Sequence, residues 1–182
     1  MDEEAYLVEE PLTAAVNVAL AKARAAAASE AEGTRIVVAA DTLVVAAARI
    51  LGKPTDAEVA RTMLMKLSGG VHHVLTGVAL LRGDVAWAGV VDTRVRMRAY
   101  VEAEVEAYIA RGEAFDKAGG YAIQDAAFRP VERIQGCYLN VVGLPLCAVS
   151  AGLAAVGVAG VAAAGPPERC AYCARGAPLV RS

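Results

Sequence analysis

A carboxylate and a lysine stand close together in the chain, each at a place where it can take part in chemistry. Asp41 follows the apolar run Ile36–Ala40, which is typical of a strand buried on both faces. We expect this strand to end at Asp41, and ligands gather at the carboxyl ends of strands in open α/β sheets. An aspartate there can bind a divalent cation or take a proton from water, although it can also simply cap a turn.

Lys53 lies on the next glycine turn, Leu51-Gly52-Lys53-Pro54. The glycine and the proline fix the backbone of this turn, and a lysine held there can contact a phosphate as a point charge. Together, Asp41 and Lys53 suit a metal-dependent site for a phosphate ester. Taken alone, Lys53 is also consistent with a solvated surface residue.

A second cluster of polar residues begins at Asp116 and Lys117 and runs into a glycine turn at Gly119 and Gly120. Glycines let the backbone approach a ligand closely, while the acid and the base offer contacts to a metal and to phosphate. Gln124 follows, and its amide can both donate and accept hydrogen bonds, which suits the edge of a nucleobase. The alternatives are a solvated turn with a local ion pair and a surface glutamine.

The histidines and cysteines give weaker signals. His72 and His73 are adjacent, so they point to opposite sides of an extended chain and we expect both to be structural. Cys170 and Cys173 form half of a zinc site or a redox pair, but they lie in a segment rich in proline and glycine, and the other two cysteines lack the paired spacing of zinc ligands.

Helices and strands are expected to alternate with short connections, which predicts an α/β fold with a mixed sheet. The capping pattern places Thr55 at the start of a helix that runs to Leu67. We expect one domain over residues 1–164 and a flexible tail over residues 165–182. The other expected elements are helices at 11–28, 102–111 and after Pro145, strands at 73–81 and 85–97 joined by the turn 82–84, and a tight turn at 118–120.

Composition excludes several classes of protein. A formal net charge of −2 and a pI near 5.7 argue against a nucleic-acid-binding chain. The uncharged stretch 143–165 is mostly alanine and glycine, which favour membrane insertion only weakly, so we expect no membrane span. The acidic start at residues 2–4 does not resemble a secretory signal, and four cysteines fit a reducing compartment, so we expect a cytoplasmic protein.

Several short motifs occur in a fixed order and together resemble one family, the Maf-type nucleoside triphosphate pyrophosphatases. The resemblance covers roughly residues 2–153. Its motifs are Ala40-Asp41-Thr42, Leu51-Gly52-Lys53-Pro54, Leu67-Ser68-Gly69 with His72, Thr76-Gly77-Val78, Asp116-Lys117-Ala118-Gly119 with Tyr121 and Gln124, and Gly136-Cys137-Tyr138 leading to Asn140-Val141-Val142-Gly143-Leu144-Pro145.

The resemblance implies a twisted mixed sheet flanked by helices, as in Maf and ITPase folds, with two lobes and a central cleft. It implies hydrolysis of nucleoside triphosphates to the monophosphate and pyrophosphate with a divalent cation, Mg²⁺ or Mn²⁺, and a possible homodimer. An Asp-Thr pair is similar to the branch of the family that acts on dTTP and UTP. The implied site consists of Asp41 as general base, Thr42, Lys53, Lys117 and Gln124 against the substrate, and Asp41, Asp116 and Glu3 (or Glu4) at the metal.

The chain departs from the family's pattern at its start. The family opens with a strand and a Ser-x-Ser-Pro-Arg-Arg loop that binds phosphate, whereas this sequence begins at the acidic segment expected further downstream. Two alternatives to an active pyrophosphatase therefore stay open. One is a truncated or impaired protein that binds nucleotides but turns them over poorly. The other is an interaction module that binds zinc or a partner through Cys170 and Cys173.

Overall fold

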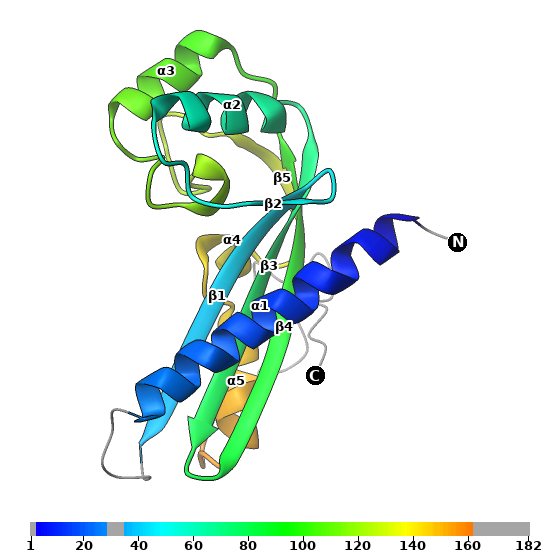
Figure 1. Ribbon diagram of the computed structural model, residues 1–182, viewed down its shortest axis with the longest axis vertical. Helices are drawn as coiled ribbons and strands as arrows, with labels where there is room; N and C mark the ends of the chain where they lie inside the picture. Colours follow the sequence, from blue (N-terminus) through cyan, green and yellow to red (C-terminus); the bar gives the residue numbers. More distant parts are fainter. Residues whose placement is uncertain (1–2, 29–34, 162–182) are drawn as a thin grey trace.

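The computed structural model describes residues 3–28 and 35–161, and for residues 3–10 it describes the backbone only. Figure 1 shows two lobes, one dominated by a twisted sheet and the other by helices. The elements in chain order are α1 (Glu3–Ala28), β1 (Ile36–Ala46), β2 (Arg49–Leu51), α2 (Ala57–Leu67), β3 (Val71–Arg82), β4 (Val85–Met97), α3 (Glu102–Ala110), a 3₁₀ turn η1 (Ala118–Gly120), β5 (Val131–Gln135), α4 (Tyr138–Val142) and α5 (Leu146–Ala155).

The sheet has the strand order β2-β1-β3-β4-β5, and each of these pairings is antiparallel. The predicted α/β class is confirmed, but the described strands form an antiparallel sheet where the sequence predicted a mixed one. The reason lies in the connections: β1–β2 and β3–β4 are joined by two-residue turns, and such tight turns can join only antiparallel strands. The predicted hairpin of β3 and β4 is thereby confirmed.

Strand β1 is longer than predicted, and this changes the position of Asp41. The strand continues to Ala46, so Asp41 lies in its middle, opposite Gly77 of β3, and not at its end. The residues after Asp41 are themselves apolar or β-branched, so they continue the ladder with β3. Since β2 pairs only with residues 44–46, β1 has no partner from β2 beside Asp41. Within the described sheet, Asp41 therefore lies on an edge.

Helix α1 covers one face of the sheet, and α4 and α5 cover the other (Figure 1). The predicted helix at 11–28 is confirmed, and it begins earlier, at Glu3. Its contact stripe consists of Ala15, Ala19 and Ala23, all fully buried. These small side chains let the helix lie so close to the sheet that a Cβ on Gly77 would be 2.2 Å from the carbonyl oxygen of Ala15. We call this part of the molecule, residues 11–51, 71–97 and 131–161, the sheet lobe.

The helical lobe consists of residues 52–70 and 98–130, with α2, α3 and η1. Helix α2 ends at Leu67 as predicted, but Asp56 and not Thr55 caps its start, because the Asp56 carboxylate accepts the Val59 N–H at 2.9 Å. The predicted helix at 102–111 is also confirmed. Aromatic rings fill the core of this lobe, where Phe128 stacks on Tyr108 at 4.6 Å and contacts Tyr100 at 5.0 Å between ring centroids.

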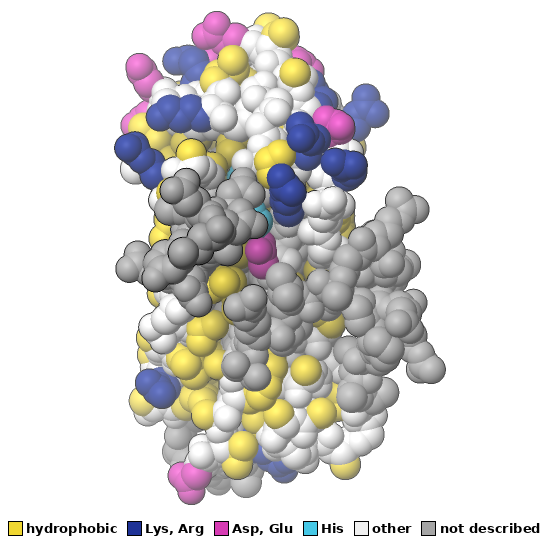
Figure 2. Space-filling model, turned by 90° about the vertical axis from the view of Figure 1, so that its right-hand side faces the viewer, with side chains coloured by type: hydrophobic (Ala, Val, Ile, Leu, Met, Phe, Trp, Pro, Cys, Tyr) yellow, Lys and Arg dark blue, Asp and Glu magenta, His cyan; other side chains and the backbone are white. Residues whose placement is uncertain are grey.

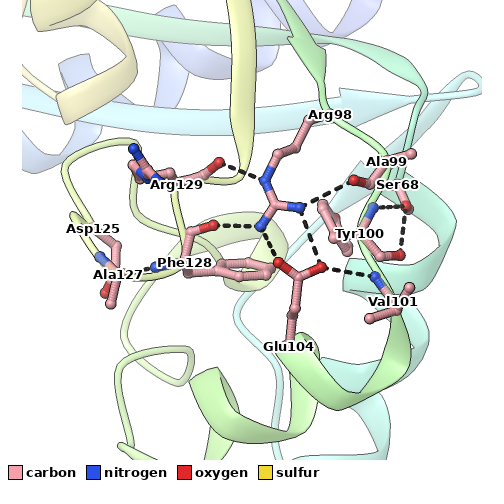
Figure 3. Close-up of polar contacts among 10 residues, drawn as sticks. All are labelled: Ser68, Arg98, Ala99, Tyr100, Val101, Glu104, Asp125, Ala127, Phe128 and Arg129. Atoms are coloured by element: carbon pink, nitrogen blue, oxygen red, sulfur yellow. Dashed lines mark hydrogen bonds and ion pairs between the residues drawn. The ribbon is translucent and has the colours of Figure 1, made fainter.

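The side chain of Arg98 ties the loop 125–130 to helix α3 (Figure 3). The Arg98 guanidinium donates to the Arg129 carbonyl at 2.9 Å, to the Phe128 carbonyl at 2.7 Å and to the Glu104 carboxylate at 2.6 Å. The hydrogen bond from Arg98, together with one from the Val101 N–H, holds the pKa of Glu104 below its usual value. The loop lacks regular structure of its own, so these directed bonds fix its course.

No helix in the described part of the chain combines the length and the apolar character that a membrane span requires. Within the alanine-rich stretch 143–165, the described helix α5 has only ten residues. The predicted tail at 165–182 lies outside the described residues, as do Cys170 and Cys173.

Candidate functional site

A cavity of about 310 Å³ is lined by residues of both lobes. The sheet lobe contributes residues of α1, β1 and β3 and the segment 141–143, while the helical lobe contributes the turn at 53 and the loop 116–124. The polar side chains in its wall are those of Lys22, Asp41, Thr42, Lys53, Asp116, Lys117, Tyr121 and Gln124. Six residues that the sequence analysis singled out, at 41, 42, 53, 116, 117 and 124, therefore meet at one cavity.

Asp41 is paired with a lysine that the sequence analysis did not identify. The Lys22 Nζ of α1 donates to Asp41 Oδ1 at 2.5 Å. The Asp41 side chain is 17% exposed and that of Lys22 is 55% exposed, so the lysine lies on the solvent side of the pair. Lys22 lies three residues after Ala19, at the border of the apolar stripe, where a charged residue is ordinary. Only the packing of α1 across β1 brings it to Asp41.

Thr42 points to the other face of β1 and belongs to a buried hydrogen-bond network. Its hydroxyl lies 2.9 Å from that of Thr76, and the Thr76 hydroxyl donates to the Asn140 carbonyl at 3.2 Å. The Thr76 proton is used in that second bond, so Thr42 is the donor of the first. Asn140 Nδ2 in turn donates to Val74 O at 2.8 Å and to Thr93 Oγ1 at 2.9 Å. The Thr42 oxygen keeps acceptor capacity toward the cavity.

A backbone hydrogen bond joins the turn that carries Lys53 to the loop that carries Lys117. The Gly119 N–H donates to the Gly52 carbonyl at 3.0 Å, which holds the Lys53 turn against the loop that carries Lys117. Gly119 has a φ of 73°, and a Cβ there would lie 3.1 Å from a Val44 methyl group, so glycine suits both its conformation and its space. The glycine turn at 118–120 thus forms as predicted and brings the two lysines to one cavity.

The two lysines of these loops differ, because Lys117 has partners within the protein and Lys53 has no ion-pair partner among the described residues. Lys117 Nζ donates to the Asp116 carboxylate at 2.6 Å and to the Glu113 carbonyl at 3.0 Å, and its hydrogen bond lowers the pKa of Asp116. Lys53 is exposed and makes no ion pair with any residue that the structure describes. Gln124 is also exposed at the cavity. Lys53 and Gln124 are therefore free to contact a ligand.

Carboxylates from two walls of the cavity, Asp41 and Asp116, are the residues suited to a metal. Mg²⁺ binds oxygen ligands and commonly uses one or two carboxylates together with substrate phosphates, so this donor set fits such an ion. Within residues 11–28 and 35–161, no group of three or more His, Cys, Asp or Glu side chains gathers around one point. Glu3 and Glu4 lie in α1, but their side chains are outside the described residues.

The two histidines point to opposite faces of β3, as predicted. His72 is buried, and its Nε2 lies 2.7 Å from the hydroxyl of Tyr121, which lines the cavity. Burial, with a smaller effect of His73, lowers the pKa of His72 to about 4, so this ring is neutral near pH 7. His73 instead contacts the Asp92 carboxylate at 3.0 Å. Cys137, which lacked zinc spacing, is buried, and Cys147, which lacked it too, is half-buried.

Comparison with known proteins supports the resemblance. The family model described as "Maf-like protein" matches residues 1–156. Two curated relatives are a dTTP/UTP pyrophosphatase of Thermomicrobium roseum, 56% identical over 60% of this chain and 50% of the relative, and a dTTP/UTP pyrophosphatase of Citrifermentans bemidjiense, 45% identical over 88% of this chain and 83% of the relative. The chain thus spans about half the length of the first and most of the second. With the match over residues 1–156, this chain belongs to the family of Maf-like proteins.

Proposed function

We propose that this chain hydrolyses dTTP and UTP to the nucleoside monophosphate and pyrophosphate. The observation that carries the proposal is the meeting of Asp41 with three lysines, Lys22, Lys53 and Lys117, around one cavity. A triphosphate carries several negative charges, and this set of cations suits it. The relatives named dTTP/UTP pyrophosphatase support the same reaction and substrates.

In this proposal Asp41 is the general base. It takes a proton from a water molecule whose oxygen forms a bond to the α-phosphorus, while the bond from that phosphorus to the α–β bridging oxygen breaks. The nucleoside monophosphate keeps the new oxygen, and pyrophosphate leaves with the bridging oxygen. The lysines reduce the charge that the attacking water must approach.

In this proposal, the ion pair of Lys22 and Asp41 is broken when the substrate binds. In the structure, Lys22 Nζ donates to Asp41 Oδ1 at 2.5 Å. A triphosphate in the cavity competes for the same ammonium group, because it carries several negative charges and the Asp41 carboxylate carries one. Substrate binding then frees the Asp41 oxygen to accept the proton of the attacking water. Lys22 therefore both contacts phosphate and controls when Asp41 is available.

A divalent cation, Mg²⁺ or Mn²⁺, completes the proposed site. Asp41 and Asp116 are the described carboxylates that would hold it, and Glu3 is the third proposed ligand. When bound, such an ion neutralises phosphate charge and withdraws electrons from the phosphorus. Lys117 holds Asp116 in its ionised form, the form that binds metal ions.

Thr42 and Gln124 are proposed to select the base. Because Thr42 gives its proton to Thr76, it can only accept a hydrogen bond from a ligand. Uracil and thymine both present one ring N–H between two carbonyl groups, so the Thr42 oxygen suits that N–H. The Gln124 amide can donate to a neighbouring carbonyl. Cytosine lacks the ring N–H and would leave Thr42 without a donor.

The test is pyrophosphate release from dTTP, UTP, CTP and 7-methyl-GTP with Mg²⁺ or Mn²⁺. We expect release from dTTP and UTP that is lost in Asp41→Asn. Asp84→Asn, which removes a carboxylate from the exposed β3–β4 turn, should leave the rate unchanged. Binding of nucleotide without release would instead indicate an impaired nucleotide-binding protein, and release by Asp41→Asn at the parent rate would refute Asp41 as the base.

The remaining expectations concern the compartment, the binding partners and the oligomeric state of the protein. A nucleotide substrate is consistent with a cytoplasmic protein that binds neither nucleic acid nor a membrane. A homodimer is expected from the family resemblance, and light scattering of the purified chain measures it directly.

A further inference from the structure

A second, smaller pocket shares no lining residue with the cavity. It has a volume of about 70 Å³ and is lined by Val71, Arg94, Arg96, Arg133 and Gln135. These residues come from β3, β4 and β5, whereas Asp41 lies on β1, on the other side of β3. We call this site the arginine pocket. Figure 2 shows Lys and Arg side chains, with several acidic side chains among them, on the upper half of the face that it draws.

The strand register explains why the three arginines meet. Arg96 lies opposite Val71 on one side and opposite Arg133 on the other, while Arg94 lies opposite Gln135. Side chains directly opposite each other on neighbouring strands share a face, as do residues two apart on one strand. A bulge between Arg96 and Met97 interrupts the ladder at this point, and bulges re-aim the side chains beside them.

These arginines lack an anionic partner within the described part of the chain. No hydrogen bond or ion pair joins their guanidinium groups to any described residue, whereas Arg61, Arg98 and Arg111 each pair with a carboxylate. Asp92 is the acid on the same face two residues before Arg94, and it is engaged by His73 at 3.0 Å. Glu132 alternates to the opposite face of β5.

The arrangement is electrostatically unfavourable without a counter-ion. Like charges directly opposite each other on neighbouring strands repel, and Arg96 and Arg133 form such a pair with Arg94 close by. A bound anion would convert this repulsion into attraction. The guanidinium group is the side chain best suited to a phosphate, because its planar fork matches two oxygens at once.

We propose that the arginine pocket binds a phosphoryl group at a site separate from the cavity. The volume of about 70 Å³, against about 310 Å³ for the cavity, suits one phosphoryl group and not a whole nucleotide. Gln135 adds an amide donor, and Val71 forms an apolar wall. Free phosphate, pyrophosphate and the phosphate of a larger ester share this chemistry. The proposal does not depend on the function proposed for the cavity.

The test measures binding to the full chain by calorimetry, at constant ionic strength with chloride as the reference anion. The probes are inorganic phosphate, pyrophosphate and UMP, and the variants are Arg96→Gln/Arg133→Gln and, at the cavity, Lys53→Gln/Lys117→Gln. We expect the arginine variant to weaken phosphate binding by at least about tenfold, since each charge-assisted hydrogen bond is worth that much or more. The cavity variant should retain phosphate binding, and so should Arg24→Gln, which removes one exposed arginine elsewhere.

The outcomes separate the two sites. Binding of UMP that is lost with that of phosphate supports a site for larger phosphate esters, and binding of free phosphate alone supports a small-anion site. Phosphate binding that is unchanged in the arginine variant, or lost only in the cavity variant, overturns the proposal. So does a parent chain that does not distinguish phosphate from chloride. If the double variant does not fold, Arg133→Gln alone gives the same comparison, because Arg133 is exposed.

Discussion

The two lobes are held together in different ways. The sheet lobe relies on close apolar packing, with Ala15, Ala19 and Ala23 of α1 set against a sheet of small and β-branched residues. The helical lobe relies on aromatic rings and directed polar bonds, with Arg98 and Tyr108 at its centre. Every ring contact and cation–π contact found among the described residues includes a residue of the helical lobe.

The difference follows from the elements that each lobe contains. In the sheet lobe, the hydrogen bonds between strands pair the backbone N–H and C=O groups. The side chains therefore need only to pack closely, and small ones let α1 approach the sheet most closely. In the helical lobe, the loop 112–130 has little regular structure, so its carbonyl and N–H groups need side-chain partners. The comparison predicts that steric changes damage the first lobe most, and loss of a hydrogen-bonding group the second.

The largest effect is expected from Gly77→Ala. A Cβ at this position would be 2.2 Å from the Ala15 carbonyl oxygen, and neither backbone can move without separating α1 from the sheet. We expect a loss of more than about 3 kcal/mol in the free energy of unfolding, measured by urea denaturation. Gly52→Ala is the matched control, because nothing lies within 4 Å of a Cβ there. Equal stabilities of the two variants would contradict close packing at Gly77.

A somewhat smaller effect is expected from Arg98→Ala in the helical lobe. The change leaves the carbonyl groups of Phe128 and Arg129 and the Glu104 carboxylate without their common donor. We expect a loss of about 2–3 kcal/mol in the free energy of unfolding. Arg98→Lys keeps the charge but not the fork, and should recover only part of this loss. Full recovery by lysine would mean that charge alone, and not directed bonding, holds the loop 125–130.

The junction between the lobes is expected to respond to pH through His72. Its pKa of about 4 in the folded protein lies below the ordinary value of 6.5, so between these values the unfolded chain binds more protons. Stability therefore falls as the pH falls through this window, by about 2 kcal/mol between pH 7 and pH 5. Denaturation of His72→Gln over the same range should show a weaker dependence. His73→Gln serves as the control, and if it removes the dependence instead, His72 is not the group responsible.

The smallest effect is expected from Arg61→Gln on the surface of the helical lobe. Arg61 pairs with Glu106, but both side chains are more than one-third exposed. Water and salt screen such a pair, so we expect no measurable change in the free energy of unfolding. Comparison with Arg98→Ala by the same denaturation experiment then separates the value of an arginine charge from that of its bonds to backbone carbonyls. A loss as large as that of Arg98→Ala would remove this distinction.

Periodicity and turn signals in the sequence predicted α2, α3, α5 and the β3–β4 hairpin. They did not predict β2, because the β1–β2 turn uses Ala47 and Ala48 at positive φ and lacks the glycine or asparagine that usually marks such a turn. Strand β5 was also missed, since three of its five residues are charged or amide side chains. Strands β2 and β5 form because β1 and β4 present backbone N–H and C=O groups for pairing. A local sequence pattern contains no information about such a neighbour.

The sequence by itself determined which chemical groups are present at the candidate site. Asp41, Thr42, Lys53, Asp116, Lys117 and Gln124 were all identified before the fold was known, and they line one cavity. The strand-end argument for Asp41 was wrong, however, because β1 continues past it. Local patterns identified Asp41 by its type and its place in a motif. That identification does not depend on where the strand ends.

Only the tertiary structure decided how these groups are paired. Lys22 meets Asp41 because α1 crosses β1, although 19 residues separate the two in sequence. The three arginines of the small pocket meet because β4 and β5 pair in one register. A helical or strand pattern fixes which side chains share a face within a few residues. Contacts between distant segments depend on packing angle and register, which the whole chain settles together.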